Sequence, residues 1–142
     1  MPIPTRPQGR HVNLLNDLFS LFASPEWASE AFLVTPKGYA SNATAAEYAR
    51  FEVVSSAGLN DSLSGILFVE IFTPNGVGPT RAYQIADLFD KYLAGATLST
   101  QGSRAVTQVS RESSFSVRGE SKGNNTTLHS TYQIPFSHFR KE

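Results

Sequence analysis

Hydrophobic positions are densest and most regular between residues 64 and 95. Residues 66–72 are apolar on both faces of a strand, and Glu70 is the only charge among them. A strand with this pattern lies in the centre of a sheet or under another layer. Pro-Asn-Gly at 74–76 then favours a turn, because proline cannot donate to a strand ladder and Asn-Gly tolerates positive φ. The pattern predicts a buried strand that ends in a tight loop.

A helix is predicted directly after this loop. Gly78 suits the N-cap and Pro79 the first helical position, and Gly95 provides a stop. Apolar residues at three- and four-residue intervals share one face of this helix, which we expect to pack against the sheet: Ala82, Ile85, Ala86, Phe89 and Leu93, with Leu88 and Tyr92 beside them.

Two more helices are predicted near the N-terminus. Ser24 suits the N-cap of a short helix that starts at Pro25 and runs to Phe32, and Trp27 on it is expected to be a core anchor. Residues 11–23 before it have helical spacing. Val12, Leu15, Phe19 and Phe22 line one side of this helix, with Leu14, Leu18 and Leu21 flanking them.

Shorter alternating patterns predict the remaining strands, which are listed at the end of this paragraph by residue range. Residues 35–44 and 119–125 are rich in small and polar residues and are expected to be loops. Pro135 places the end of the last strand at an edge or a bulge. The order of elements predicts an α+β fold, with a mainly antiparallel (mixed) β-sheet and two main helices packed against it. The predicted strands besides 66–72 are 48–55, 97–101, 105–117 and 128–136.

The composition limits the function classes. A chain of 142 residues and 15.5 kDa fits a single domain over 1–142, with the proline-rich residues 1–9 as an extended arm. Twelve basic and twelve acidic residues cancel, so no broad positive surface for nucleic acid is expected. The absence of cysteine excludes thiolate catalysis and cysteine–zinc sites. No apolar run is long enough for a membrane segment, so we expect a protein of the cytoplasm.

Candidate chemistry along the chain is sparse. Glu70 could act as a general base in an apolar strand, but a charge paired with an arginine is the favoured interpretation. Gly-Val-Gly at 76–78 begins like a dinucleotide fingerprint, yet Arg81 stands where its third glycine should be. No metal or cofactor is expected, because the histidines lack ligand spacing: His11, His129 in a polar strand face, and His138 in a polar tail. The absence of a catalytic constellation favours a structural or assembly protein, not an enzyme.

The arrangement of two segments resembles the tail-terminator-like proteins of long-tailed bacteriophages. These segments are FVEIFTPNGVGPTRAYQIADLFDKYL and the closing YQIPFSHFRKE. The resemblance covers residues 50–142. Ala-Asp-Leu-Phe at 86–89 stands where the family has a helix of this character, and Pro-Phe at 135–136 matches the pair that ends its closing strand. The segment 32–44 departs from the family pattern, since it is longer and more polar.

The resemblance implies a homo-oligomeric ring, usually a hexamer, at the head-proximal end of the virion's tail. Such a ring stops polymerisation of the tail tube protein and offers a surface to the head-tail connector protein, while DNA only passes through it. The part of the chain that would carry subunit contacts is expected to be charged and off the core faces: Arg50, Glu52, Arg81, Asp87 and Asp90. Asp87 and Asp90 are both expected on the exposed side of their helix. A loop that holds Arg118, Glu120 and Lys122 would reach a partner or the lumen.

Two alternatives stay open. Another neck protein, either a head-closure or a tail-completion factor, would share the size, the architecture and the ring symmetry. A small-ligand binding or enzyme domain would instead use Glu70 and an apolar pocket lined by Phe68, Phe72 and Tyr83.

Overall fold

The computed structural model describes residues 10–36, 47–57, 62–74, 79–99, 105–121 and 124–140. The predicted arm, residues 1–9, and most of the predicted loop 35–44 lie outside these ranges. In chain order the described elements are α1 (Arg10–Phe22), α2 (Pro25–Ala28), β1 (Leu33–Pro36), β2 (Tyr48–Ala57), β3 (Leu63–Pro74), α3 (Thr80–Leu93), β4 (Thr97–Leu98), β5 (Ala105–Val109), β6 (Ser114–Ser121) and β7 (Asn124–Arg140).

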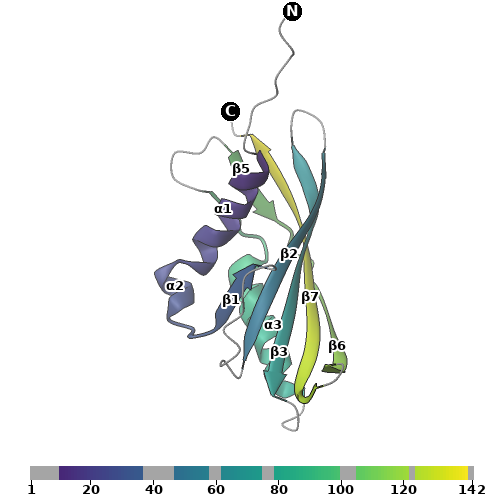
Figure 1. Cartoon of the computed structure of the whole chain (residues 1–142). Helices are drawn as coiled ribbons and strands as arrows, with labels where there is room; N and C mark the ends of the chain where they lie inside the picture. The colour runs from purple at the N-terminus through teal and green to yellow at the C-terminus, as the bar shows by residue number, and fades with distance from the viewer. Residues whose placement is uncertain are drawn as a thin grey trace, which may run out of the picture.

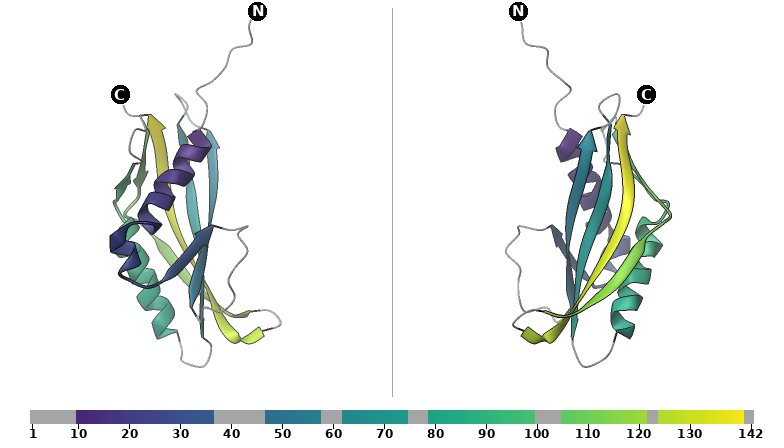
Figure 2. Two further views of the ribbon diagram at one scale, coloured as in Figure 1. Left: turned by 60° about the vertical axis from the view of Figure 1, so that its left-hand side comes forward. Right: turned by 90° about the vertical axis from the view of Figure 1, so that its right-hand side faces the viewer.

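The strands form one sheet in the order β1-β2-β3-β7-β5-β4, and β6 also pairs with β7 (Figure 1). β1 runs parallel to β2, whereas the other pairs are antiparallel. α1 and α3 pack on one side of this sheet (Figure 2). The predicted α+β fold with a mixed, mainly antiparallel sheet is therefore confirmed. β3 lies between β2 and β7, the central position that its apolar pattern predicts.

The core fills the space between the two main helices and the sheet. Phe89 of α3 is fully buried at its centre and contacts the rings of Trp27, Phe22, Phe32 and Tyr132. Trp27 is the predicted anchor, since it is 2% exposed and its indole N–H donates to the Phe32 carbonyl at 3.1 Å. The predicted face of α3 is confirmed, because the residues buried on this helix are Ala82, Ile85, Ala86, Phe89 and Leu93.

The buried side of α1 differs from the prediction. Leu14 and Leu18 are buried, whereas Val12 and Leu15 are 59% and 37% exposed. Phe19 and Phe22 of the predicted side do pack against the core, as do the flanking Leu14, Leu18 and Leu21. The centre of the buried stripe is therefore shifted toward the flanking leucines, where Asp17 is also buried.

The helix ends agree with the prediction except for small shifts. The Ser24 hydroxyl caps α2 by accepting from the Trp27 backbone N–H at 3.2 Å, but α2 ends at Ala28 and not at residue 32. Its C-cap is Ser29, and Ala31 has a φ of 56° before β1 begins. Pro79 is the N-cap of α3 and not its first residue.

The C-terminal strands depart most from the prediction. The single strand predicted over 105–117 is two strands, β5 and β6. Of the loop predicted over 119–125, residues 119–121 belong to β6 and residues 124–125 to β7, and residues 122–123 lie outside the described residues. Pro135 lies inside β7, which has neighbours on both sides, and not at a sheet edge. Its carbonyl accepts from the Ser110 N–H at 2.9 Å, in the gap between β5 and β6. Because N–H and C=O of one strand residue point to the same neighbour, the missing donor of Pro135 faces this gap.

Candidate subunit interface

One face of the sheet points away from the helices, and we call it the outer face. Residues of β2, β3 and β7 that alternate with core residues share it. Among the described residues, no helix covers it (Figure 2, right). The outer face consists of Tyr48, Arg50, Glu52, Val54, Ile66, Phe68, Glu70, Phe72, His129, Thr131, Gln133 and Pro135.

Three rings cross the outer face in register. Tyr48 and Phe72 stack with centroids 4.8 Å apart, and Phe72 stacks on His129 at 4.9 Å and an interplanar angle of 4°. The Arg50 guanidinium lies 5.0 Å from the Phe72 centroid, the position of a cation–π contact. These neighbours leave Phe72 only 6% exposed. This end of the face is therefore held in one arrangement by cross-strand contacts.

Glu70 forms the charged centre of the outer face. Arg50 Nη2 and His129 Nε2 lie 3.5 Å and 3.8 Å from its Oε2 atom, so the predicted pairing with an arginine is confirmed. A half-exposed ion pair of this kind adds little to stability. Arg50 Nε and His129 Nε2 find no hydrogen-bond partner among the described residues although both atoms are buried. The polar network is thus incompletely paired within one subunit.

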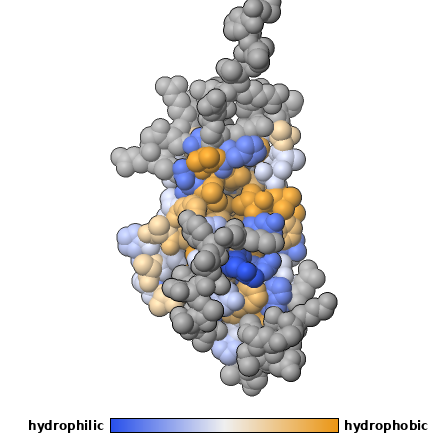
Figure 3. Space-filling model, in the orientation of Figure 1, coloured by the Kyte–Doolittle hydropathy of each residue, from blue (hydrophilic) through white to orange (hydrophobic). Residues whose placement is uncertain are grey.

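Apolar side chains continue the outer face beyond the ion pair. Val54 is 54% exposed, and Ile66 and Phe68 are half-buried. In the orientation of Figure 1, in which the outer face is turned to the right-hand side, a space-filling view shows apolar surface at mid-height of the molecule, bordered by hydrophilic residues (Figure 3). β3 is apolar on both faces, yet only its inner side has a covering layer in the described structure. The outer face is therefore the best candidate for a protein–protein interface.

The five predicted contact residues are not brought together. Arg50 and Glu52 lie on the outer face, whereas Arg81 and Asp87 lie on α3, which packs on the opposite side of the sheet. Arg81 Nε donates to Glu47 Oε2 at 2.6 Å, and this hydrogen bond raises the pKa of the guanidinium. Asp87 is exposed, as predicted.

Asp90 is turned toward the sheet, so its predicted exposed position is wrong. Its Oδ1 atom accepts hydrogen bonds from the Tyr132 and Ser113 hydroxyls, both at 2.6 Å. Burial raises the pKa of the Tyr132 hydroxyl, and the bond to Asp90 raises it further. Tyr132 is 42 positions away in sequence, so helix periodicity alone could not reveal this role.

Replacing Asp90 by alanine is expected to lower the free energy of unfolding by about 1–3 kcal/mol, because two hydroxyls lose their acceptor at the edge of the core. Asp87→Ala, the same change one turn earlier on an exposed site, should alter it by less than about 0.5 kcal/mol. Chemical denaturation of both variants measures the difference. Equal effects would mean that Asp90 has no structural role.

The predicted partner loop is only partly described. Arg118 and Glu120 have backbone positions in β6, a strand that among the described residues pairs with β7 alone. The β6–β7 register shifts between Val117 and Gly119 and again between Glu120 and Ser121. Lys122 lies outside the described residues.

A buried polar cluster was not predicted from the sequence. The Thr107 hydroxyl donates to Asp17 Oδ2 at 2.7 Å and lies 2.8 Å from His138 Nδ1. Since that hydroxyl proton points to Asp17, we assign the imidazole proton to Nδ1, which donates to Thr107 Oγ1. His138 is 1% exposed, so its predicted location in a polar tail is wrong. All three side chains are sealed from solvent, and the cluster ties α1 to β5 and β7.

Acid is expected to destabilise the protein through His138. Burial lowers the pKa of its imidazole, and the Asp17 carboxylate offsets this only in part. The unfolded chain then binds the proton more readily, so the stabilisation is complete above the ordinary pKa of 6.5 and is lost as pH falls through the lowered folded-state value. Denaturation of wild type and His138→Gln from about pH 7.5 to about pH 5 should show a smaller loss in the variant. Parallel stability curves would contradict this account.

The ligand pocket suggested by the sequence does not form. Phe68 and Phe72 lie on the outer face, whereas Tyr83 of α3 is 53% exposed and packs edge-on against Phe115. Among the described residues, no three acidic or histidine side chains cluster as metal ligands. In the same part of the chain, no helix is long and apolar enough to span a membrane.

Comparison with known proteins shows a similarity of fold only. No protein-family model matches the chain, and no curated protein matches it. Its structure is similar to a solved structure, of a protein whose name describes no function, with a TM-score of 0.64 and 20% sequence identity. The match covers 91% of this chain and 96% of the other. Nearly the whole chain therefore adopts a fold that a protein of similar length also has.

Proposed function

We propose that this protein is a phage tail terminator, a virion protein that forms a hexameric ring on the head-proximal end of the tail tube. The observation that carries the proposal is the outer face, where apolar side chains and an incompletely paired ion network lie on β2, β3 and β7 with no covering layer among the described residues. The sequence resemblance to tail-terminator-like proteins is the reason to propose that this assembly is the ring at the end of the tail tube. The ring would stop tube growth and bind the head-tail connector protein.

Ring symmetry determines how the outer face would be used. In a cyclic assembly each subunit contacts its two neighbours through two different patches. The outer face is one of these patches in our proposal, with Phe68 and Ile66 as its apolar centre. The Arg50–Glu70 pair would disfavour wrong partners more than it strengthens the contact. The balanced charge of the chain suits a ring through which DNA passes without being retained.

The proposal is tested by polymerising the tail tube protein of the same phage with and without this protein. A terminator should shorten the tubes and leave one ring at a tube end in electron micrographs. Phe68→Glu should lose this activity because it places a charge in the apolar centre of the outer face. Gln84→Glu, which adds the same charge on exposed α3, should retain it.

Unaltered tube length with wild-type protein would contradict the terminator function. Rings that bind the connector protein but leave the tubes uncapped would instead indicate a head-closure or tail-completion factor, which the outer face would serve equally well.

A further inference from the structure

After its first residue, α1 exposes no carboxylate, lysine or arginine side chain. Within residues 11–22 the one such side chain is Asp17, and it is buried. Val12 and Leu15 are 59% and 37% exposed on the same helix. A helix at a protein surface ordinarily turns charged residues to solvent, as α3 does with Asp87. Apolar residues without charged neighbours are instead typical of the centre of a protein–protein interface.

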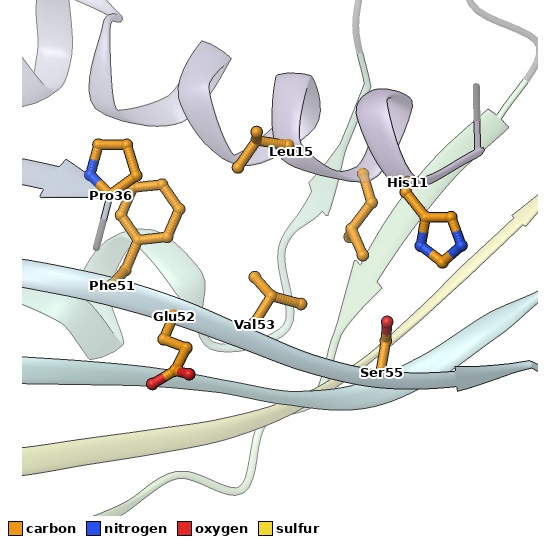
Figure 4. A pocket seen from close by; sticks show the side chains of 8 residues that line it. His11, Leu15, Pro36, Phe51, Glu52, Val53 and Ser55 are labelled. Atoms are coloured by element: carbon orange, nitrogen blue, oxygen red, sulfur yellow. The ribbon is translucent and has the colours of Figure 1, made fainter. Parts of the chain in front are cut away.

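The exposed apolar side of α1 continues into a pocket between α1 and β2 (Figure 4). The pocket has a volume of about 410 Å³. In Figure 4 Leu15 points from α1 toward Phe51 and Val53 of β2, whereas Glu52 points away. The apolar surface therefore extends from the helix to the edge of the sheet, and we call it the α1 patch. Its members are Val12, Leu14, Leu15, Phe51 and Val53.

The α1 patch and the outer face lie on opposite sides of the subunit. α1 packs on one side of the sheet, and the outer face is the other side of that sheet (Figure 2). A head-to-tail ring requires two different patches on each subunit, one for each neighbour, and they must face in different directions for the copies to close into a ring. The outer face already serves one neighbour in the proposed function. The α1 patch lies where the contact with the other neighbour is required.

A helix from a neighbouring copy would give β3 a second covering layer. β3 is apolar on both faces, and the helices of its own subunit cover only the inner one among the described residues. A strand of this kind ordinarily lies between two layers. Val12 and Leu15 would cover Ile66 and Phe68 without placing against them a charge that is costly to desolvate.

The polar part of the exposed side of α1 suits the charged centre of the outer face. Asn16 is exposed one turn after Val12. Its amide group both donates and accepts hydrogen bonds, so it would pair with Arg50 or Glu70 without adding a third charge. The ion pair would then keep polar partners when a neighbouring copy covers it.

We propose that the α1 patch of one copy packs on the outer face of the next copy and that this pair of surfaces is the repeating contact of the ring. Val12 and Leu15 lie against Ile66 and Phe68 in this contact. The inference rests on the proposed ring and adds to it the identity of the second patch. In such a contact α1 does not meet α1, and the outer face does not meet another outer face.

Cross-linking tests the contact directly, because the chain has no cysteine of its own. The double variant Val12→Cys/Val54→Cys places one thiol on the α1 patch and one on the outer face, both at exposed positions. A bis-maleimide cross-linker should join successive copies into a covalent ladder of up to six chains on a denaturing gel. Gln84→Cys/Val54→Cys, with its first thiol on exposed α3, is the matched control and should give no ladder.

The single variants distinguish a head-to-tail contact from a two-fold one. Val12→Cys alone and Val54→Cys alone should remain uncross-linked in assembled particles. Cross-linked dimers of Val54→Cys alone would mean that two outer faces meet each other, and they would overturn the proposal. Assembled particles of the double variant that give no more ladder than the control would overturn it as well.

A charged residue in the α1 patch provides a second measurement. Val12→Glu is compatible with folding because Val12 is exposed, and it should reduce the wild-type particles to monomers of 15.5 kDa in light scattering. Full-size Val12→Glu particles that no longer bind the tail tube or the connector protein would assign the α1 patch to that partner and overturn the contact between copies. A monomeric wild-type protein would contradict the ring itself, whereas intact particles without the ladder would contradict the α1 contact alone.

Discussion

Phe89→Ala is expected to destabilise the protein by about 3–5 kcal/mol, the range for removing a fully buried phenylalanine ring. The ring is 0% exposed and contacts Trp27 of α2, Phe22 of α1 and Tyr132 of β7. Its loss leaves a cavity bordered by three separate elements. Because these elements are held by their own pairings and caps, they cannot close the cavity completely, and the upper part of the range applies.

Chemical denaturation measures the loss, and Gln84→Ala provides the control. Gln84 is exposed on the same helix, and its replacement should change the free energy of unfolding by less than about 0.5 kcal/mol. A loss below about 1 kcal/mol for Phe89→Ala would mean that the helices and sheet repack freely, which contradicts a single fixed core.

Gly65→Val is the second change with a large expected effect. Gly65 lies in β3 opposite Ser55 of β2. A Cβ atom built on Gly65 would lie 1.9 Å from the Val54 carbonyl oxygen and 2.7 Å from the Ser55 Cα. Both contacts are to backbone, so no side-chain rotation can relieve them. The two strands would have to separate at this point, with a loss of about 3 kcal/mol, the upper end of the range for overpacking.

The usual effect of this substitution has the opposite sign, since valine is favoured over glycine in a strand. Ser64→Val, at the exposed neighbouring position of β3, is therefore the informative comparison. Ser64→Val should be neutral or mildly stabilising in thermal unfolding, and Gly65→Val should unfold at a much lower temperature. If both variants were equally stable, the close approach of β2 and β3 would be wrong.

The spacing of apolar residues was enough to predict the helices and strands whose buried side chains follow a regular period. α3 and β3 were predicted with their faces because their apolar residues have an unbroken helical or strand spacing and glycine or proline marks their ends. The Arg50–Glu70 pair was also predictable, since a lone carboxylate in an apolar strand requires a cation nearby.

The errors arise where a distant partner overrides the local pattern. Asp17 interrupts the apolar stripe of α1, and in its buried position it accepts a hydrogen bond from Thr107, 90 positions away in the sequence. His138 continues the inward alternation of Tyr132, Ile134 and Phe136, so the period of two in β7 was the signal that could have found it. The break between β5 and β6 follows from the pairing of both strands with β7, which composition does not encode.

The candidate contact residues were chosen from the sequence by their charge, and the structure does not bring them together. Arg50 and Glu52 do lie on the uncovered face, but Asp90 serves the fold of its own subunit. The apolar members of the outer face, Ile66 and Phe68, were already visible as the second apolar side of β3. The pattern predicted a strand in the centre of the sheet or under another layer; β3 is central, and the proposed ring would add a layer from a neighbouring copy.

The solution mass of the purified protein, measured by light scattering beside that of Phe68→Glu, tests the proposed ring most directly. Our account predicts wild-type particles of about 93 kDa, six copies of the 15.5 kDa chain, and folded Phe68→Glu monomers. Gln84→Glu should match wild type. A wild-type protein that stays at 15.5 kDa at every concentration, or a Phe68→Glu variant that still forms the same particles, would contradict a ring built through the outer face.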